Sequence, residues 1–239
     1  MRSKWPVSVS FVAFLASGCM GGSVDVGPKP DYDPRLQPPD FVAAIDNPFL
    51  PMPVGARWTY EVEDERIDVV VLDETRMIQG VRATVVRDTV TVDGEVVEDT
   101  FDWYAQDRRG NVWYLGEDTT EYEDGEPVSH AGAWEWGKDG ALPGIVMWGD
   151  PRPNGTAYYQ EFLWGEAIDQ AAVVALDQPV AIPLGTYRDT VTTREWNPLD
   201  GGSADDGYEV VHYAKGIGPI EKGHPGEPKE TLVDYQMPS

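Results

Sequence analysis

Residues 82–105 read RATVVRDTVTVDGEVVEDTFDWYA, and this stretch decides the fold. Two runs rich in Val, Thr and aromatic residues flank the dipeptide Asp93-Gly94. Glycine adopts the positive φ of a tight hairpin turn without steric cost, and β-branched and aromatic residues favour extended backbone. The stretch therefore predicts two neighbouring antiparallel strands.

The second run alternates in a way that assigns its two faces. Phe101, Trp103 and Ala105 fall on one side of an extended chain, while Asp102 and Tyr104 fall on the other. This period of two is typical of a half-buried strand.

The rest of the chain repeats the same pattern of short apolar bursts between Gly, Pro and Asp. Helix is expected only in fragments such as 39–45 or 166–172, and 137–156 is expected to be a Gly/Pro-rich loop. About ten short strands with local turns predict a mainly β protein, with one curved antiparallel sheet or barrel-like wrap. The further strands are expected at 57–63, 66–74, 111–117, 157–164, 170–176, 180–182, 187–196, 208–214 and 231–235.

The composition is strongly acidic. Asp and Glu number 42 against 18 Lys and Arg, which gives a formal charge of −24. Such a field repels phosphate backbones, so nucleic acid is excluded as a partner. Cation binding and simple solubility are both consistent with this charge.

The N-terminus has the features of an export signal. Arg2 and Lys4 precede an apolar run over 5–15, which is too short to span a bilayer, and small residues follow. We therefore expect residues 1–18 to be a signal peptide. The segment 15–19 (LASGC) resembles the lipobox of bacterial lipoproteins, and this resemblance implies an acyl anchor such as palmitate on Cys19, with ordinary signal cleavage as the alternative.

Residues 19–40 are rich in Pro, Gly and Asp, and they are expected to form a disordered tether behind the lipidated cysteine. Residues 41–239 are expected to form a single β domain. The predicted location is extracytoplasmic, on a bacterial membrane reached through the lipid anchor, and on the outer membrane if the cell has one. The oligomeric state is left open.

Several stretches resemble an uncharacterised group of bacterial secreted and lipid-anchored β proteins. They are 53–60 (PVGARWTY), 102–107 (DWYAQD), 110–114 (GNVWY), 182–187 (IPLGTY) and 213–220 (YAKGIGPI). The resemblance implies a fold built on turn glycines and core aromatics, and it implies no activity. Some such proteins also resemble lipoprotein-carrier domains, in which a curved sheet cups acyl chains.

Catalytic residues are scarce. The three histidines show no metal-type spacing, and the sequence lacks a Gly-x-Ser-x-Gly motif. Paired carboxylates next to aromatic residues are the better enzyme candidate, because glycoside cleavage needs two of them facing a sugar. The candidate carboxylates, each next to or within three residues of an aromatic residue, are Asp102, Glu117, Glu135 and Glu161.

No cofactor is expected, with Ca²⁺ as an alternative because oxygen ligands cluster around two turn glycines. The candidate ligands are Glu121, Glu123 and Asp124 beside Gly125, and Asp205 and Asp206 beside Gly207. Simple acidic β-turns explain these residues equally.

The aromatic residues suggest a binding surface. Trp134 and Trp136 are expected to share a strand face and to project into a cleft, whereas Trp58, Trp103 and Trp113 are expected to be core. The candidate ligand-binding residues are Tyr104, Tyr114, Trp134, Trp136, Trp148, Tyr158 and Trp164.

Three functions remain open from the sequence. The first is a non-enzymatic, membrane-tethered module that binds a small apolar or carbohydrate ligand on the concave side of the sheet. The second is a secreted polysaccharide hydrolase with paired carboxylates. The third is a structural envelope protein, which a filled sheet interior would favour.

Overall fold

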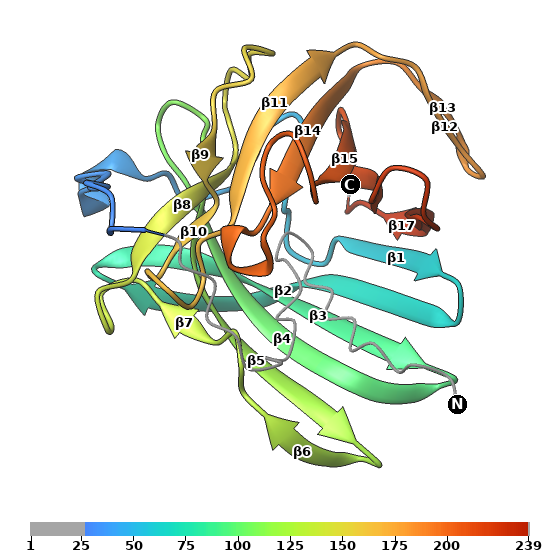
Figure 1. Ribbon diagram of the computed structural model, residues 1–239, viewed down its shortest axis with the longest axis horizontal. Helices are drawn as coiled ribbons and strands as arrows, with labels where there is room; N and C mark the ends of the chain where they lie inside the picture. The colour runs from blue at the N-terminus through green and yellow to red at the C-terminus, as the bar shows by residue number, and fades with distance from the viewer. Residues whose placement is uncertain (1–26, 239) are drawn as a thin grey trace.

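The computed structural model describes residues 27–238, so the predicted signal peptide and Cys19 lie outside the described residues. The described chain forms one large antiparallel sheet that curls into a nearly closed barrel, as predicted, with very little helix (Figure 1). Within residues 27–238, no helical segment has the length and hydrophobicity needed to cross a bilayer.

The described residues contain 17 strands, more than the sequence predicted, and two short 3-10 helices. Their bounds are η1 (Pro38–Asp40), β1 (Arg57–Val62), β2 (Glu65–Ile78), β3 (Val81–Val92), β4 (Glu95–Gln106), β5 (Val112–Glu123), β6 (Glu126–Ser129), β7 (Trp134–Glu135), β8 (Leu142–Met147), β9 (Tyr158–Tyr159), β10 (Glu161–Phe162), β11 (Gln170–Leu176), β12 (Val180–Ile182), β13 (Gly185–Tyr187), β14 (Thr190–Trp196), η2 (Pro198–Asp200), β15 (Glu209–Ala214), β16 (Gly218–Gly223) and β17 (Glu230–Gln236).

The main sheet has the order β10-β8-β5-β4-β3-β2-β1-β17-β16-β15-β14-β11-β9. β1 to β5 form a meander of hairpins, and β17 pairs with β1. The predicted turn between β3 and β4 is confirmed, with φ of 53° at Asp93 and 84° at Gly94. Both values lie in the left-handed region that two-residue hairpins use.

The sheet closes through one short piece of chain. β9 pairs with β11 at one edge of the sheet, and β10 pairs with β8 at the other edge. Only Gln160 separates β9 from β10 in the sequence, so residues 158–162 bridge the two edges. We call residues 158–162 the seam.

Three expectations about secondary structure are wrong. The expected loop 137–156 contains β8, the expected helix fragment 166–172 runs into β11, and β16 was not expected as a strand. In each case pairing with a neighbouring strand determines the structure. β8, for example, pairs with β5 on one side and with the seam on the other, although Pro143 and Gly144 have low intrinsic strand propensity.

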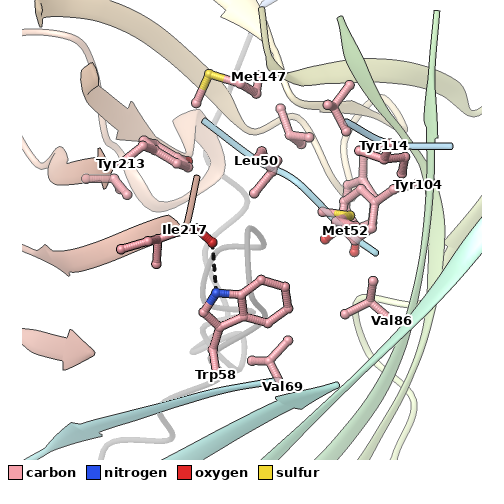
Figure 2. Close-up of a cluster of buried hydrophobic side chains, with 14 of the residues drawn as sticks. Leu50, Met52, Trp58, Val69, Val86, Tyr104, Tyr114, Met147, Tyr213 and Ile217 are labelled. Atoms are coloured by element: carbon pink, nitrogen blue, oxygen red, sulfur yellow. Dashed lines mark hydrogen bonds between the residues drawn. The ribbon is translucent and has the colours of Figure 1, made fainter. Parts of the chain in front are cut away.

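The barrel interior is filled by side chains from all around the sheet (Figure 2). Leu50 and Met52, from the segment before β1, pack between Trp58 on β1 and Tyr114 on β5. The Trp58 indole N–H donates to the Ile217 carbonyl over 2.8 Å, so this buried ring also satisfies its polar atom. The concave side of the sheet is therefore the core.

A second apolar cluster lies on the opposite face of β2 to β5 and β8, and it contains Trp103, Ala105 and Trp113. The alternation predicted for β4 is confirmed, but both of its faces are buried here. Leu36 and Phe41 from the N-terminal segment cover this second cluster.

The N-terminal segment also contacts the seam. The Tyr32 hydroxyl donates to the Pro143 carbonyl over 2.8 Å, and its ring packs against Tyr159 and Phe162. Packed chain thus begins near Tyr32, before the boundary at Phe41 that the sequence suggested.

Candidate functional site

Four acidic side chains meet inside the barrel beside the seam. Asp102 on β4 and Glu117 on β5 are cross-strand partners, Glu161 lies on β10, and Asp169 immediately precedes β11. Their exposed fractions are 0%, 6%, 3% and 3%, respectively. We call these four residues the acid cluster.

The hydrogen bonds to the acid cluster come from neutral side chains and not from cations. Tyr114 donates its hydroxyl proton to Asp102 over 2.5 Å. Thr119 donates to Glu117 over 3.0 Å. The Asn197 side-chain amide donates to Asp169 over 3.2 Å from the loop that contains η2.

Burial shifts the protonation of the whole cluster. It raises the pKa of Asp102 to about 7, against the opposing effect of the Tyr114 hydrogen bond. Burial likewise raises the pKa of Asp169 to about 7. Burial and the neighbouring acids raise the pKa values of Glu117 and Glu161 well above the ordinary range. The cluster therefore holds protons at neutral pH, because ionised carboxyl groups are costly in an apolar interior.

A cation with a largely buried side chain lies further along the barrel. The Lys222 ammonium is 3.5 Å from Glu230, and Glu209, Glu195 and Asp88 also act on it. Burial opposes its charge, but these carboxylates together raise the Lys222 pKa above its ordinary value.

Beside this lysine lies a cavity of about 10 Å³, with Tyr60, Tyr213 and Glu195 among its lining residues. Such a volume accommodates roughly one water molecule.

Three of the four carboxylates nominated for glycoside cleavage do come together in this cluster. Glu135 does not, because it lies on the outer side, where Arg76 and Lys138 bind it at 2.6 and 3.0 Å. Glycoside hydrolysis requires a sugar between the two carboxyl groups. All four carboxyl groups of the cluster are at most 6% exposed, so packed side chains enclose them.

The structure divides the nominated aromatic residues into two groups. Tyr104, Tyr114 and Trp134 are at most 5% exposed, and the rings of Tyr104 and Tyr114 stack with centroids 4.8 Å apart. They fill the interior and do not line an open concave surface. Trp136, Trp148, Tyr158 and Trp164 are half-buried nearer the surface.

The expected common cleft of Trp134 and Trp136 is wrong. β7 ends at Glu135, and the backbone N–H groups of Trp136 and Lys138 bond to Leu115 and Glu135 in a turn. As a result Trp134 packs in the interior cluster, whereas Trp136 packs on the outer one.

The calcium candidates lie at the end of β5 and in two turns. Glu121, Glu123 and Asp124 belong to the β5–β6 hairpin, and Asp205 and Asp206 lie in the exposed turn before β15. Within the described residues, His, Cys, Asp and Glu side chains form no group of three or more that could hold a metal ion.

Each of the three histidines forms a hydrogen bond to a backbone carbonyl or a hydroxyl group. His130 and His224 contact the carbonyls of Thr119 and Tyr208, and His212 contacts the Thr192 hydroxyl.

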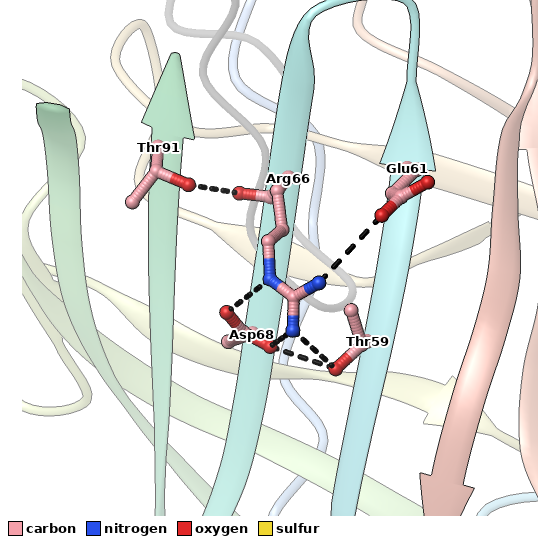
Figure 3. Close-up of polar contacts among 5 residues, drawn as sticks. All are labelled: Thr59, Glu61, Arg66, Asp68 and Thr91. Carbon is pink, nitrogen blue, oxygen red and sulfur yellow. Dashed lines mark hydrogen bonds and ion pairs between the residues drawn. The ribbon is translucent and has the colours of Figure 1, made fainter. Parts of the chain in front are cut away.

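On the outer surface, bases and acids pair locally. Figure 3 shows Arg66 on β2 bound to Asp68 at 2.9 Å and to Glu61 on β1 at 3.6 Å. Hydrogen bonds from Arg66 and Thr59 to Asp68 outweigh partial burial, so the pKa of Asp68 is lowered. Such exposed pairs contribute little to stability.

Asp88, Asp169 and Lys222 belong to the interior charged network but were not predicted from the sequence. The burial of Asp88 could have been predicted, because Asp88 falls on the same face of β3 as the inward-facing Val86 and Val90. The burial of Asp169 could not have been predicted, since it depends on the seam and on the η2 loop folding over it.

Comparison with known proteins gives no relative. No family model matches the chain, and neither a curated protein nor a solved structure matches it.

Proposed function

We propose that this protein is a non-catalytic, lipid-anchored extracytoplasmic module that acts through the outer surface of an acidic barrel. The observation that carries this proposal is the filled interior. Side chains such as Trp58, Tyr104 and Tyr213 occupy the concave side, where an apolar ligand or a substrate would otherwise bind. This supports the structural or surface-binding alternatives over the hydrolase and over a carrier of acyl chains.

The anchor is part of the proposal. Cys19 is the single cysteine of the chain, and Tyr32, which packs on the barrel, lies 13 positions after it. At about 3.3 Å per extended residue, this length lets the barrel stand roughly 40 Å from an acylated Cys19.

Metabolic labelling with palmitate tests the anchor. The wild-type chain should incorporate label and partition into detergent, and Cys19→Ser should do neither, while the matched control Ser23→Ala should retain both. An unlabelled wild-type protein would remove the anchor from the proposal.

The outer surface offers one aromatic patch suited to a ligand. Tyr32, Tyr159, Phe162 and Trp164 form a chain of ring contacts with centroids 4.8 to 6.0 Å apart, and all except Phe162 are partly exposed. Partly exposed rings such as Tyr32, Tyr159 and Trp164 can stack on sugars, so a carbohydrate is the ligand class that this surface favours.

Intrinsic tryptophan fluorescence tests the surface proposal directly. Oligosaccharides of glucose and N-acetylglucosamine should change the emission of the wild type, and Trp164→Ala should lose the response. Palmitic acid should give no saturable change at pH 6. Saturable palmitic acid binding, or measurable hydrolysis of the sugars, would contradict the proposal.

A further inference from the structure

The seam joins the edges of the barrel through two of its shortest ladders. β9 pairs with β11 only through Tyr158 and Tyr159, and β10 pairs with β8 only through Glu161 and Phe162. By contrast, β3 pairs with β2 and β4 along most of its length. Local opening of a structure starts where few contacts and backbone hydrogen bonds must break. The seam is therefore one of the places where the barrel is expected to open, together with the β16–β17 ladder, which also has only two register pairs.

Side-chain and turn contacts supplement these short ladders. The Gln160 N–H donates to the Asp169 carbonyl over 2.8 Å, and the Gln160 side-chain amide donates to Glu195 on β14 over 3.1 Å. Glu161 lies on the seam itself, while Asp169 leads into β11. The Glu161 and Asp169 carboxyl groups are neighbours, so this pair joins the seam to the adjoining strand.

The pair lies in an environment of other acids. Electrostatic interactions with this pair come from the carboxyl groups of Asp102 on β4, Glu117 on β5 and Asp200 on η2, and from the phenols of Tyr104 and Tyr114. Among the described residues, no donor meets hydrogen-bond geometry at Glu161 Oε2 or Asp169 Oδ1. The Trp134 indole N–H lies near Glu161 and acts to lower its pKa, against the larger effects of burial and Asp169. A proton shared between the two carboxyl groups supplies that donor, and its loss leaves two buried like charges in contact.

We propose that Glu161 and Asp169 form a proton-operated latch, in which a shared proton holds the seam in the sheet and loss of that proton releases residues 158–162. The released seam exposes the aromatic interior along the edges of β8 and β11. This inference does not depend on the lipid anchor or on a surface ligand, because it concerns only the closure of the barrel.

The direction of the pH effect follows from burial. Because burial and nearby acids raise the pKa of Glu161, and burial raises that of Asp169 to about 7, the closed state binds the proton more tightly than the open state. Raising the pH therefore favours opening, by up to about tenfold in population per pH unit for each proton lost.

Hydrogen exchange of the full chain, corrected for intrinsic chemical rates, measures this opening at pH 5.5 and 8.5. Peptides covering 158–170 should lose protection at least about tenfold more than peptides covering 82–92, which lie in the centre of the sheet. Equal loss in both regions would overturn the latch, because it would indicate global destabilisation.

Two variants and one control sharpen the test. Glu161→Gln keeps a donor toward Asp169 without a titratable group, so its seam should remain protected at pH 8.5. Asp169→Asn should behave in the same way and serves if the first variant fails to fold. Glu166→Gln, at an exposed position in the turn beside the seam, should retain the wild-type pH dependence. A folded Glu161→Gln or Asp169→Asn variant that still opens with rising pH would also overturn the proposal.

Discussion

Tyr114 on β5 donates a hydrogen bond to Asp102 on β4 over 2.5 Å, and both side chains are at most 1% exposed. The Tyr114 ring is also clamped, by stacking on Tyr104 and by an edge contact with Trp134. Asp102 thus accepts a hydrogen bond from a hydroxyl group that is held in place inside an apolar barrel. Hydrogen bonds to charged groups in such settings are stronger than neutral ones.

Removing this donor should destabilise the barrel in a pH-dependent way. Tyr114→Phe leaves Asp102 without its hydroxyl partner, and it should lower the free energy of unfolding by about 1–3 kcal/mol. The loss should be larger at pH 8 than at pH 5, because the hydrogen bond favours the ionised form of Asp102. Urea denaturation at both pH values measures it, with the exposed Tyr235→Phe as control. An equal loss at both pH values would contradict the account of Asp102.

The buried lysine leads to a second prediction. Lys222→Met removes the cation that Glu230, Glu209 and Glu195 share, and it should cost about 3–5 kcal/mol because these acids lose their counter-charge. Lys138→Met, whose side chain is 61% exposed, should cost less than about 1 kcal/mol. Thermal unfolding at pH 7 compares the two variants, and similar costs would show that Lys222 is dispensable.

The sequence pattern predicted the fold well where strands that pair in the sheet also follow one another in the chain. The Asp93-Gly94 turn and the alternation around Trp103 are local signals, and they suffice for the β3–β4 hairpin. β8 could not be predicted in this way, because its Pro143 and Gly144 favour a loop until β5 and the seam pair with it.

The candidate site was only partly visible for the same physical reason. Asp102, Glu117 and Glu161 were nominated because an aromatic residue lies near each of them in the sequence. The aromatic residues Trp103, Tyr114 and Phe162 are indeed buried. The convergence of the three carboxyl groups with Asp169 depends on closure of the barrel between segments about 60 residues apart. The spacing of these residues in the sequence carries no sign of that closure.

Buried acids also determine the pH of maximum stability. Because the folded state raises the pKa of Asp102 and of Asp169 to about 7, it binds more protons than the unfolded chain between about pH 4 and 7. The contribution of these two groups to stability is then fully present below about pH 4 and is lost as the pH rises through 7. The salt-bridged Asp68 and Glu135, with lowered pKa values, lose their contribution only as pH falls below about 4.

Chemical denaturation across pH should therefore show an optimum between roughly pH 4 and 6. From pH 5.5 to 8.5 the free energy of unfolding should fall by on the order of 2 kcal/mol for each of Asp102 and Asp169. Asp102→Asn should flatten this decline, whereas Asp99→Asn, on the outer side in a pair with Arg87, should not. A stability optimum above pH 7.5 would refute the assignment.

Gly144 tests whether closure of the barrel needs close backbone contact. A Cβ at this position would lie 2.2 Å from the Gln160 carbonyl carbon and 2.6 Å from the Glu161 nitrogen, both of them backbone atoms that cannot move without shifting the seam. Gly144→Ala should therefore lower the free energy of unfolding by about 1–3 kcal/mol or more. It should also expose residues 158–162 to hydrogen exchange even at pH 5.5.

Gly94→Ala provides the contrast, since open space surrounds Gly94 and only its φ of 84° opposes a side chain. It should cost about 1–2 kcal/mol and leave exchange in the seam unchanged. If Gly144→Ala left the seam protected from hydrogen exchange, the backbones of β8 and the seam would pack less tightly at Gly144 than the structure indicates. Closure of the barrel would then rest on the side chains of Tyr32, Gln160 and the acid cluster alone, because the short ladders of β9 and β10 could not maintain it.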